Sequence, residues 1–152
     1  MRQIGDLPCV LLAGGLLVLA GCSADPLRVA DHSDITGLHF TTSSAFPGNP
    51  PPTNVDVMLT DPTPSRRIYG ATLALPYFQG HVSCPIDLGY SHTISFLSGQ
   101  IVADSATLNP GGCREATIAG APPERQTDDA YWALLAQSLG VEKSALFSLA
   151  SP

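Results

Sequence analysis

The chain has 152 residues, of which 44% are hydrophobic, 13% are charged and 7% are aromatic, with 14 glycines and 14 prolines. This length and hydrophobic fraction suit one turn-rich globular domain and exclude a disordered or collagen-like chain. Seven basic and 13 acidic residues give a net charge of −6, and the basic residues are scattered apart from Arg66 and Arg67, so nucleic-acid binding, which needs a clustered basic surface, is disfavoured.

Residues 1–21 have the pattern of an export signal. Arg2 precedes an apolar stretch from Leu7 to Gly21, which is long enough for such a signal and short for a membrane-spanning helix. The stretch ends in Leu19-Ala20-Gly21-Cys22, which resembles the bacterial lipobox. That resemblance implies cleavage before Cys22, a lipid on its thiol, and a domain held on the exported side of the cell membrane or outer membrane. A plain secretory signal cleaved near Ala24, or a signal anchor, is the alternative.

The mature chain is predicted to contain a lipidated tether, residues 22–34, and a single domain, residues 35–152. Polar residues recur at short intervals from Ser23 to Asp34, so we expect this segment to be a tether that holds the domain away from the lipid. The proline-rich stretch from Ser43 to Asn54 is expected to form a surface loop or a polyproline segment.

Two strands and a helix are predicted in the first half of the domain. The strands are Asp34–Thr42 and Val55–Thr60, the second because its apolar residues alternate with Asp56 and Thr60. Asp61-Pro62 has the chemistry of a helix start, and Pro76 is expected to stop that helix. Its buried face is predicted to contain Ile68, Ala71, Thr72 and Leu75.

Three further strands follow. Tyr90–Leu97 alternates, with Tyr90, His92, Ile94 and Phe96 on one side, and Ser98-Gly99 suits a hairpin turn into Gln100–Leu108. Asn109–Gly112 suits a type II turn before a strand over Arg114–Ala119.

A second helix is predicted near the end of the chain. Thr127 is expected to cap it and Gly140 to end it. Its apolar stripe consists of Tyr131, Leu134, Leu135, Ser138 and Leu139. Trp132 lies on the same helix and is interpreted as a core or groove-edge residue rather than a ligand-stacking one.

These elements predict an α+β fold, with an antiparallel sheet of four or five strands and two helices packed on one face, because hairpin turns rather than helical crossovers join the later strands. One core is expected to join Ile94, Phe96, Val102, Leu108 and Ile118 on strands to Ile68, Leu75, Leu134, Leu135 and Leu139 on helices. So small a sandwich leaves little volume, and we expect no cofactor and no deep apolar cavity.

The four cysteines are predicted to have different chemical roles. Cys9 leaves with the signal and Cys22 carries lipid, so Cys84 and Cys113 are expected to form one structural disulfide on the exported side of the membrane. A closed loop of this length contributes about 3 to 4 kcal/mol in the chain-entropy model. A metal site made of Cys84, Cys113, His81 and His92 is the alternative, although no second close pair with zinc-like spacing follows His81 and Cys84.

The sequence predicts a protein that is not an enzyme. It lacks the nucleophile elbow, the zinc-protease helix motif, the phosphate-binding loop and the dinucleotide fingerprint. His32 is interpreted as a solvated loop histidine and His92 as a satisfied, partly buried one. The charges of Arg66, Arg67, Arg114 and Glu115 are expected to face solvent.

Two resemblances extend this interpretation. Six segments carry the first: Thr60–Pro62, Leu73–Pro76, Cys84–Asp87, Phe96–Gly99, Gly112–Glu115 and Tyr131–Leu135. In these segments the chain resembles a family of small secreted or lipid-anchored bacterial proteins, and this resemblance implies no particular activity.

The second covers Val82 to Cys113, where a Cys-Pro pair, a hairpin and a second cysteine about thirty residues on resemble the subtilisin inhibitors secreted by streptomycetes. It implies that Cys84-Pro85-Ile86-Asp87 is a protease-binding loop, that Ile86 enters the primary pocket, and that a disulfide keeps the loop rigid. The inhibitors' additional disulfide has no counterpart here, and Asp87 places a charge after the scissile bond. Alternatively, Cys84-Pro85 starts a strand and the disulfide fastens the sheet edge.

We therefore expect a lipid-anchored cell-envelope protein with a non-catalytic binding or structural role and a protein partner in the envelope. A membrane-anchored serine protease inhibitor is the alternative.

Overall fold

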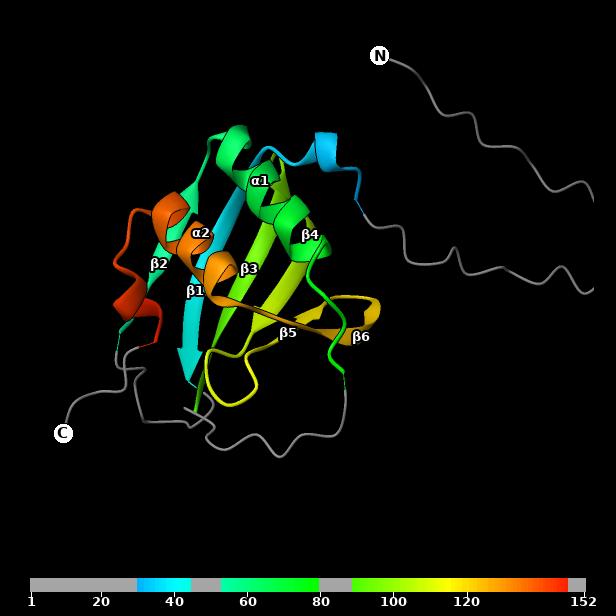
Figure 1. Cartoon of the computed structure of the whole chain (residues 1–152). Helices are drawn as coiled ribbons and strands as arrows, with labels where there is room; N and C mark the ends of the chain where they lie inside the picture. The colour runs from blue at the N-terminus through cyan, green and yellow to red at the C-terminus, as the bar shows by residue number, and fades with distance from the viewer. Residues whose placement is uncertain (1–29, 45–52, 80–88, 148–152) are drawn as a thin grey trace, which may run out of the picture.

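The computed structural model describes residues 30–44, 53–79 and 89–147, which form a twisted antiparallel sheet with two α-helices and two short 3₁₀ helices (Figure 1). The predicted signal, Cys22, His81 and the Cys84–Asp87 segment lie outside these residues. In chain order the elements are η1 (His32–Asp34), β1 (Gly37–Ser44), β2 (Asp56–Leu59), α1 (Pro62–Leu73), β3 (Tyr90–Ser98), β4 (Ile101–Leu108), β5 (Glu115–Ile118), β6 (Ala121–Gln126), α2 (Asp129–Leu139) and η2 (Lys143–Leu146).

The sheet has the strand order β2-β1-β3-β4-β5-β6, and each neighbouring pair is antiparallel. The α+β architecture is confirmed, but the described sheet has six strands rather than four or five. The sequence analysis missed β6, because Pro122 and Pro123 lack the N–H donors that a strand normally uses. Prolines are tolerated there because β6 is the last strand of the described sheet, and the bridge on its outer side, between Tyr77 and Arg125, lies beyond the two prolines.

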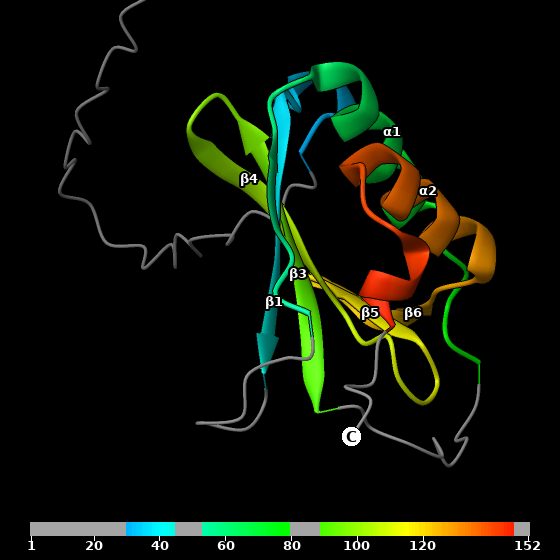
Figure 2. The same cartoon turned by 90° about the vertical axis from the view of Figure 1, so that its left-hand side faces the viewer.

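Both α-helices cover the same face of the sheet, as predicted (Figure 2). We call the opposite side the open face. Of the predicted core, Ile94, Phe96, Leu108, Ile118, Ile68, Leu75, Leu135 and Leu139 are buried. Leu134 is only half-buried. The sheet contributes Leu38 and Phe40 of β1 to the same core.

The predicted burial of Val102 is wrong, because its side chain is 56% exposed. The cause is a β-bulge: Phe96 pairs with Asp104, whereas the next residue, Leu97, pairs with Val102, so Ala103 is an extra residue in β4. One extra residue inverts the alternation of side chains. Val102 therefore joins Leu97 on the open face.

Local capping chemistry sets the helix boundaries. The Asp61 carboxylate accepts a hydrogen bond from the Thr63 N–H at 2.8 Å, which confirms the predicted start of α1. The cap of α2 is Asp128 rather than the predicted Thr127, because Asp128 accepts from the Tyr131 N–H at 2.7 Å. Gly140 ends α2 in the left-handed region with φ 68°, as predicted.

The last residues of the predicted tether pack on the domain. The Arg66 guanidinium donates to the carbonyl oxygens of Ile35 at 2.9 Å and Ser33 at 2.8 Å, and the Tyr69 hydroxyl donates to the carbonyl oxygen of Ala30 at 3.0 Å. Arg66 is therefore a packing contact of η1 rather than a free surface charge. The packed part of the chain includes Ala30 to Asp34, upstream of the expected boundary at residue 35.

Candidate binding surface on the open face

The open face is neutral and rich in hydroxyl groups over the central strands. Its middle row consists of four threonines in cross-strand register, with Thr41 opposite Thr93, Thr93 opposite Thr107, and Thr107 opposite Thr117. Serines flank this row, and the hydroxyl oxygens of Ser43 and Ser91 lie 3.4 Å apart. Polar side chains are typical of a solvated antiparallel face.

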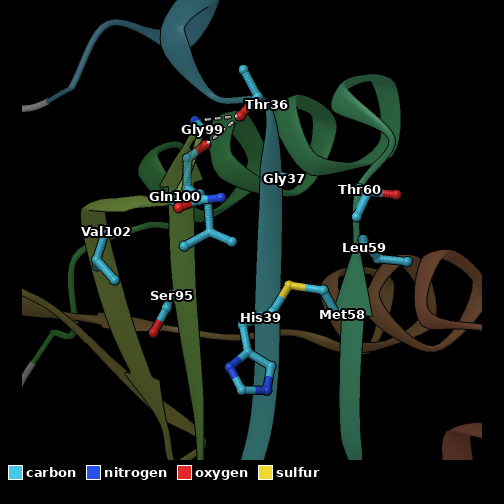
Figure 3. A pocket seen from close by; sticks show the side chains of 11 residues that line it. Thr36, Gly37, His39, Met58, Leu59, Thr60, Ser95, Gly99, Gln100 and Val102 are labelled. Atoms are coloured by element: carbon cyan, nitrogen blue, oxygen red, sulfur yellow. Dashed lines mark hydrogen bonds between the residues drawn. The ribbon is translucent and has the colours of Figure 1, made fainter.

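Apolar side chains interrupt this pattern at one end of the open face. A hollow of about 560 Å³ lies there, over β2, β1, β3 and the start of β4 (Figure 3). Met58 is 53% exposed and Val102 is 56% exposed at its rim. The residues that line the hollow are Thr36, Gly37, His39, Met58, Leu59, Thr60, Ser95, Leu97, Gly99, Gln100 and Val102.

Backbone geometry keeps the hollow open. A Cβ atom on Gly37 would lie 2.7 Å from the carbonyl oxygen of Leu59, so a side chain would push β1 and β2 apart. Gly99, with φ 63°, lies in the turn of the β3–β4 hairpin. The two-residue loop is Gly99-Gln100, one residue later than the predicted Ser98-Gly99. The Thr36 hydroxyl accepts from the Gly99 N–H at 2.8 Å and so ties the hairpin to the start of β1 (Figure 3).

His39 is the titratable group among the described lining residues. Its Nε2 lies 2.7 Å from Oδ1 of Asp56, so the pair links β1 to β2 across the open face. Ser95 lies opposite His39 in the β1–β3 register, but its hydroxyl points away from the imidazole (Figure 3). This arrangement lacks the serine–histidine contact that nucleophilic catalysis needs. The apolar part of the lining comes from Met58, Leu59, Leu97 and Val102.

His92 has hydrogen-bond partners, as predicted, but it is fully rather than partly buried. Its Nδ1 lies 2.9 Å from the Thr42 hydroxyl and its Nε2 lies 3.0 Å from the carbonyl oxygen of Leu146. Burial lowers the pKa of His92 below its ordinary value, which favours the neutral ring. Both nitrogens are engaged, which argues against the alternative metal site. No group of three potential metal ligands occurs within the described ranges.

The other residues singled out in the sequence have structural contacts. Trp132 is fully buried and donates from Nε1 to the Thr127 hydroxyl at 2.9 Å, which confirms a core role. His32 is exposed in η1, where its ring lies against Gly70. Arg114 is not simply a solvent-facing charge, because it bonds Asp129 at 2.7 Å and lies over the Phe147 ring at 5.1 Å.

Cys113 lies in the turn between β4 and β5. Because Leu108 of β4 pairs with His92 of β3, this turn is at the end of the sheet where β3 begins, as predicted. Gln79, the last described residue before the segment that contains Cys84, lines a second hollow together with Cys113. The bond between Cys84 and Cys113 stays a prediction, since Cys84 lies outside the described residues.

No helix in the described part of the chain is long and apolar enough to cross a membrane. No protein-family model, no curated protein and no solved structure matches the chain.

Proposed function

We propose that this chain is a lipid-anchored cell-envelope protein with a non-catalytic binding role. In this proposal Cys22 carries the lipid, and the apolar end of the open face, formed by Met58, Leu97 and Val102, makes the contact. The lipobox-like sequence Leu19–Cys22 supports the anchor. The hollow rimmed by exposed Met58 and Val102 is the observation that carries the binding role.

The distribution of apolar side chains favours a binding surface over an ordinary solvated face. The central row of this face consists of threonines, and polar residues suffice to keep such a face in water. Met58 and Val102 instead leave more than half of their surface in water at the rim of one hollow. Grouped exposure of this kind is typical of surfaces that contact a partner, whereas scattered exposure is not.

A site-specific photo-crosslinker tests the binding role in the intact cell envelope. The crosslinker replaces Val102 in the full chain, and a control chain carries it at Thr117, an exposed position on β5 away from the hollow. We expect irradiation to give adducts from position 102 and not from position 117. Absence of adducts at both positions, or equal yields from both, would contradict the proposal.

The anchor is tested by the Cys22→Ala variant. A lipid on Cys22 predicts that wild-type protein incorporates labelled fatty acid and stays in the membrane fraction, because two or more acyl chains hold a protein stably on a bilayer. Cys22→Ala is expected to lose the label and to accumulate as an uncleaved or secreted form. Equal labelling of both proteins would exclude the anchor.

A membrane-anchored serine protease inhibitor that uses Cys84-Pro85-Ile86-Asp87 is the second candidate. One observation favours it. Gln79 and Gly89 are the described residues on either side of this segment, and both lie at the end of the sheet that carries Cys113. A disulfide to Cys113 would then fix the base of the segment, and a rigid loop loses little conformational entropy when a protease binds it.

The inhibitor proposal is tested by titrating a subtilisin-type protease with the full chain. Inhibition is expected, and Ile86→Gly is expected to weaken it by roughly tenfold or more, because it empties the protease's primary pocket. Thr117→Ala is the matched control and should inhibit like the wild type. A protease that keeps full activity at saturating protein would overturn this candidate.

A further inference from the structure

We propose that the residues Ala30–Ile35 form a strap that is held on α1 and limits how far the domain reaches from the membrane. The proposal rests on the proposed lipid at Cys22, because only an anchored domain has a limited reach. Two observations support it: the contacts that hold the strap on α1, and the small number of positions between the strap and Cys22.

Side chains of α1 hold both ends of the strap. At one end, Nε and Nη2 of Arg66 donate to the carbonyl oxygens of Ile35 at 2.9 Å and Ser33 at 2.8 Å. At the other end, the Tyr69 hydroxyl donates to the carbonyl oxygen of Ala30 at 3.0 Å. Because Arg66 and Tyr69 are three positions apart in a helix, they lie on the same side of α1. The strap therefore runs along one side of this helix.

The middle of the strap also fits α1. A Cβ atom on Gly70 would lie only 2.9 Å from Nε2 of His32, so the glycine leaves room for the imidazole ring. The Asp31 carboxylate accepts hydrogen bonds from the N–H and the hydroxyl of Ser33, which shape the strap into η1. In both views η1 lies beside α1 (Figures 1 and 2). The strap is thus packed as a part of the domain.

The strap shortens the chain between the lipid and the domain. Ala30 follows Cys22 by eight positions, so the chain between them spans at most about 29 Å. If the strap left α1, the first residue held by the domain would be Ile35, whose side chain is fully buried. Ile35 follows Cys22 by thirteen positions, which span at most about 47 Å. The docked strap therefore removes about 18 Å from the longest reach.

This limit confines the domain to a layer close to the membrane. It holds whichever face of the domain turns toward the lipid, because it depends only on where the chain leaves the domain. A tether that cannot span the distance to a partner gives no binding. A partner protein at the same membrane fits this reach, whereas a protein held beyond it does not.

Hydrogen exchange of the full chain tests whether the strap is docked. Arg66→Ala removes two of the bonds to the strap. Tyr69→Phe removes the third, together with the bond to Asp104, and keeps the buried ring. Arg67→Ala is the matched control, because this neighbouring arginine is exposed and makes no bond to the strap in the described part of the chain.

We expect the strap amides to exchange roughly tenfold faster or more in Arg66→Ala, because hydrogen bonds from a charged donor are lost. Tyr69→Phe should act in the same direction, and Arg67→Ala should exchange like the wild type. Amides of β3, in the interior of the sheet, serve as the internal reference for global unfolding. If the strap exchanges equally, relative to β3, in Arg66→Ala, Tyr69→Phe and Arg67→Ala, the docked strap is ruled out.

Energy transfer to the membrane tests the reach. The lipidated chain is placed in phosphatidylcholine vesicles with dansyl-labelled headgroups, and the donor is Trp132, the only tryptophan of the chain. Its aromatic contacts are His92, Tyr131 and Phe147, all outside the strap. The r.m.s. span of a flexible chain grows as the square root of its length, so thirteen positions reach roughly 1.3-fold farther than eight.

We expect energy transfer to fall roughly 1.5-fold in Arg66→Ala, because transfer decreases steeply with this distance. Arg67→Ala should transfer like the wild type, and equal transfer in both variants would overturn the proposed limit on reach. Flotation of the same vesicles separates this failure from failure of the anchor. If the wild-type chain floats no better than Cys22→Ala, the proposed function itself is wrong, whereas hydrogen exchange still reports the docking of the strap.

Discussion

At the residue scale, the buried polar side chains are held by partners distant in sequence. His92 contacts Thr42 and Leu146, which are 50 and 54 positions away. Its ring packs on Trp132 with 5.8 Å between centroids, and Trp132 in turn donates to Thr127. Because buried polar groups without partners are costly, these contacts help to specify how β1, β3 and η2 meet.

His92 predicts a pH dependence of stability. Burial lowers its pKa in the folded state, so the unfolded chain binds the proton more tightly. The free energy of unfolding is therefore unaffected well above pH 6.5 and falls as the pH drops below it, by at most about 1.4 kcal/mol per pH unit for this one proton.

Denaturant unfolding between pH 8 and pH 5 measures this effect. His92→Gln removes the titrating group while its amide can still donate to the Leu146 carbonyl, so we expect a smaller loss of stability between pH 7 and pH 5 than in the wild type. His32→Gln, at an exposed position, is the control and should keep the wild-type dependence. If the free energy of unfolding of His92→Gln falls with pH as steeply as that of the wild type, His92 is not the source of the pH dependence.

At the scale of elements, α2 shows how packing separates residues that a helical pattern groups together. Leu134 and Leu135 both belong to the predicted apolar stripe. In the structure Leu135 is fully buried against the core, whereas Leu134 is half-buried beside a shallow hollow between α1 and α2. A stripe on a helix identifies the buried side but not its centre, because the neighbouring helix decides where water is excluded.

Leu135→Ala is therefore expected to lower the free energy of unfolding by about 2 to 5 kcal/mol, since it removes buried methyl groups and leaves a cavity. Leu134→Ala is the matched control, because it removes the same atoms from a half-buried position, and we expect it to cost clearly less. Denaturant melts of the two variants give both values. Equal losses would contradict the packing of α2 described above.

At the scale of the whole molecule, the two ends of the sheet differ. One end carries the hollow with the exposed residues Met58 and Val102. The other end carries Cys113 and the residues that flank the segment with Cys84. The proposed binding surface at the hollow and the residues that flank the candidate inhibitor segment therefore lie at opposite ends of the sheet.

A disulfide between Cys84 and Cys113 is the prediction at this scale. Tyr90, six positions after Cys84, pairs at the end of the sheet where Cys113 lies, and bridged cysteines need Cα atoms within about 7 Å. Titration of the unfolded, unreduced mature protein with a thiol reagent should find neither cysteine reactive. Reduction should release both thiols and lower the melting temperature. Two reactive thiols before reduction would exclude the bond.

Local signals in the sequence located most elements. The start of α1 at Asp61-Pro62, the end of α2 at Gly140 and the strand at Tyr90 were all predictable, because caps and side-chain alternation depend on residues a few positions apart. The choice of one sheet face for both helices also followed from the apolar pattern. The lipobox-like sequence and the remaining cysteine pair were likewise available from the sequence, although the described structure does not test them.

Tertiary structure decided the rest. Val102 is exposed because a bulge at Ala103 inverts β4, and the bulge lies beside the hairpin that Thr36 fastens to β1. Pro122 and Pro123 belong to a strand because β6 is at the sheet edge, where a missing donor costs little. Met58 and Val102 line the same hollow because the strand order β2-β1-β3-β4 brings their strands into one sheet. Each outcome rests on contacts between distant segments, which form only when the sheet assembles and which no local pattern encodes.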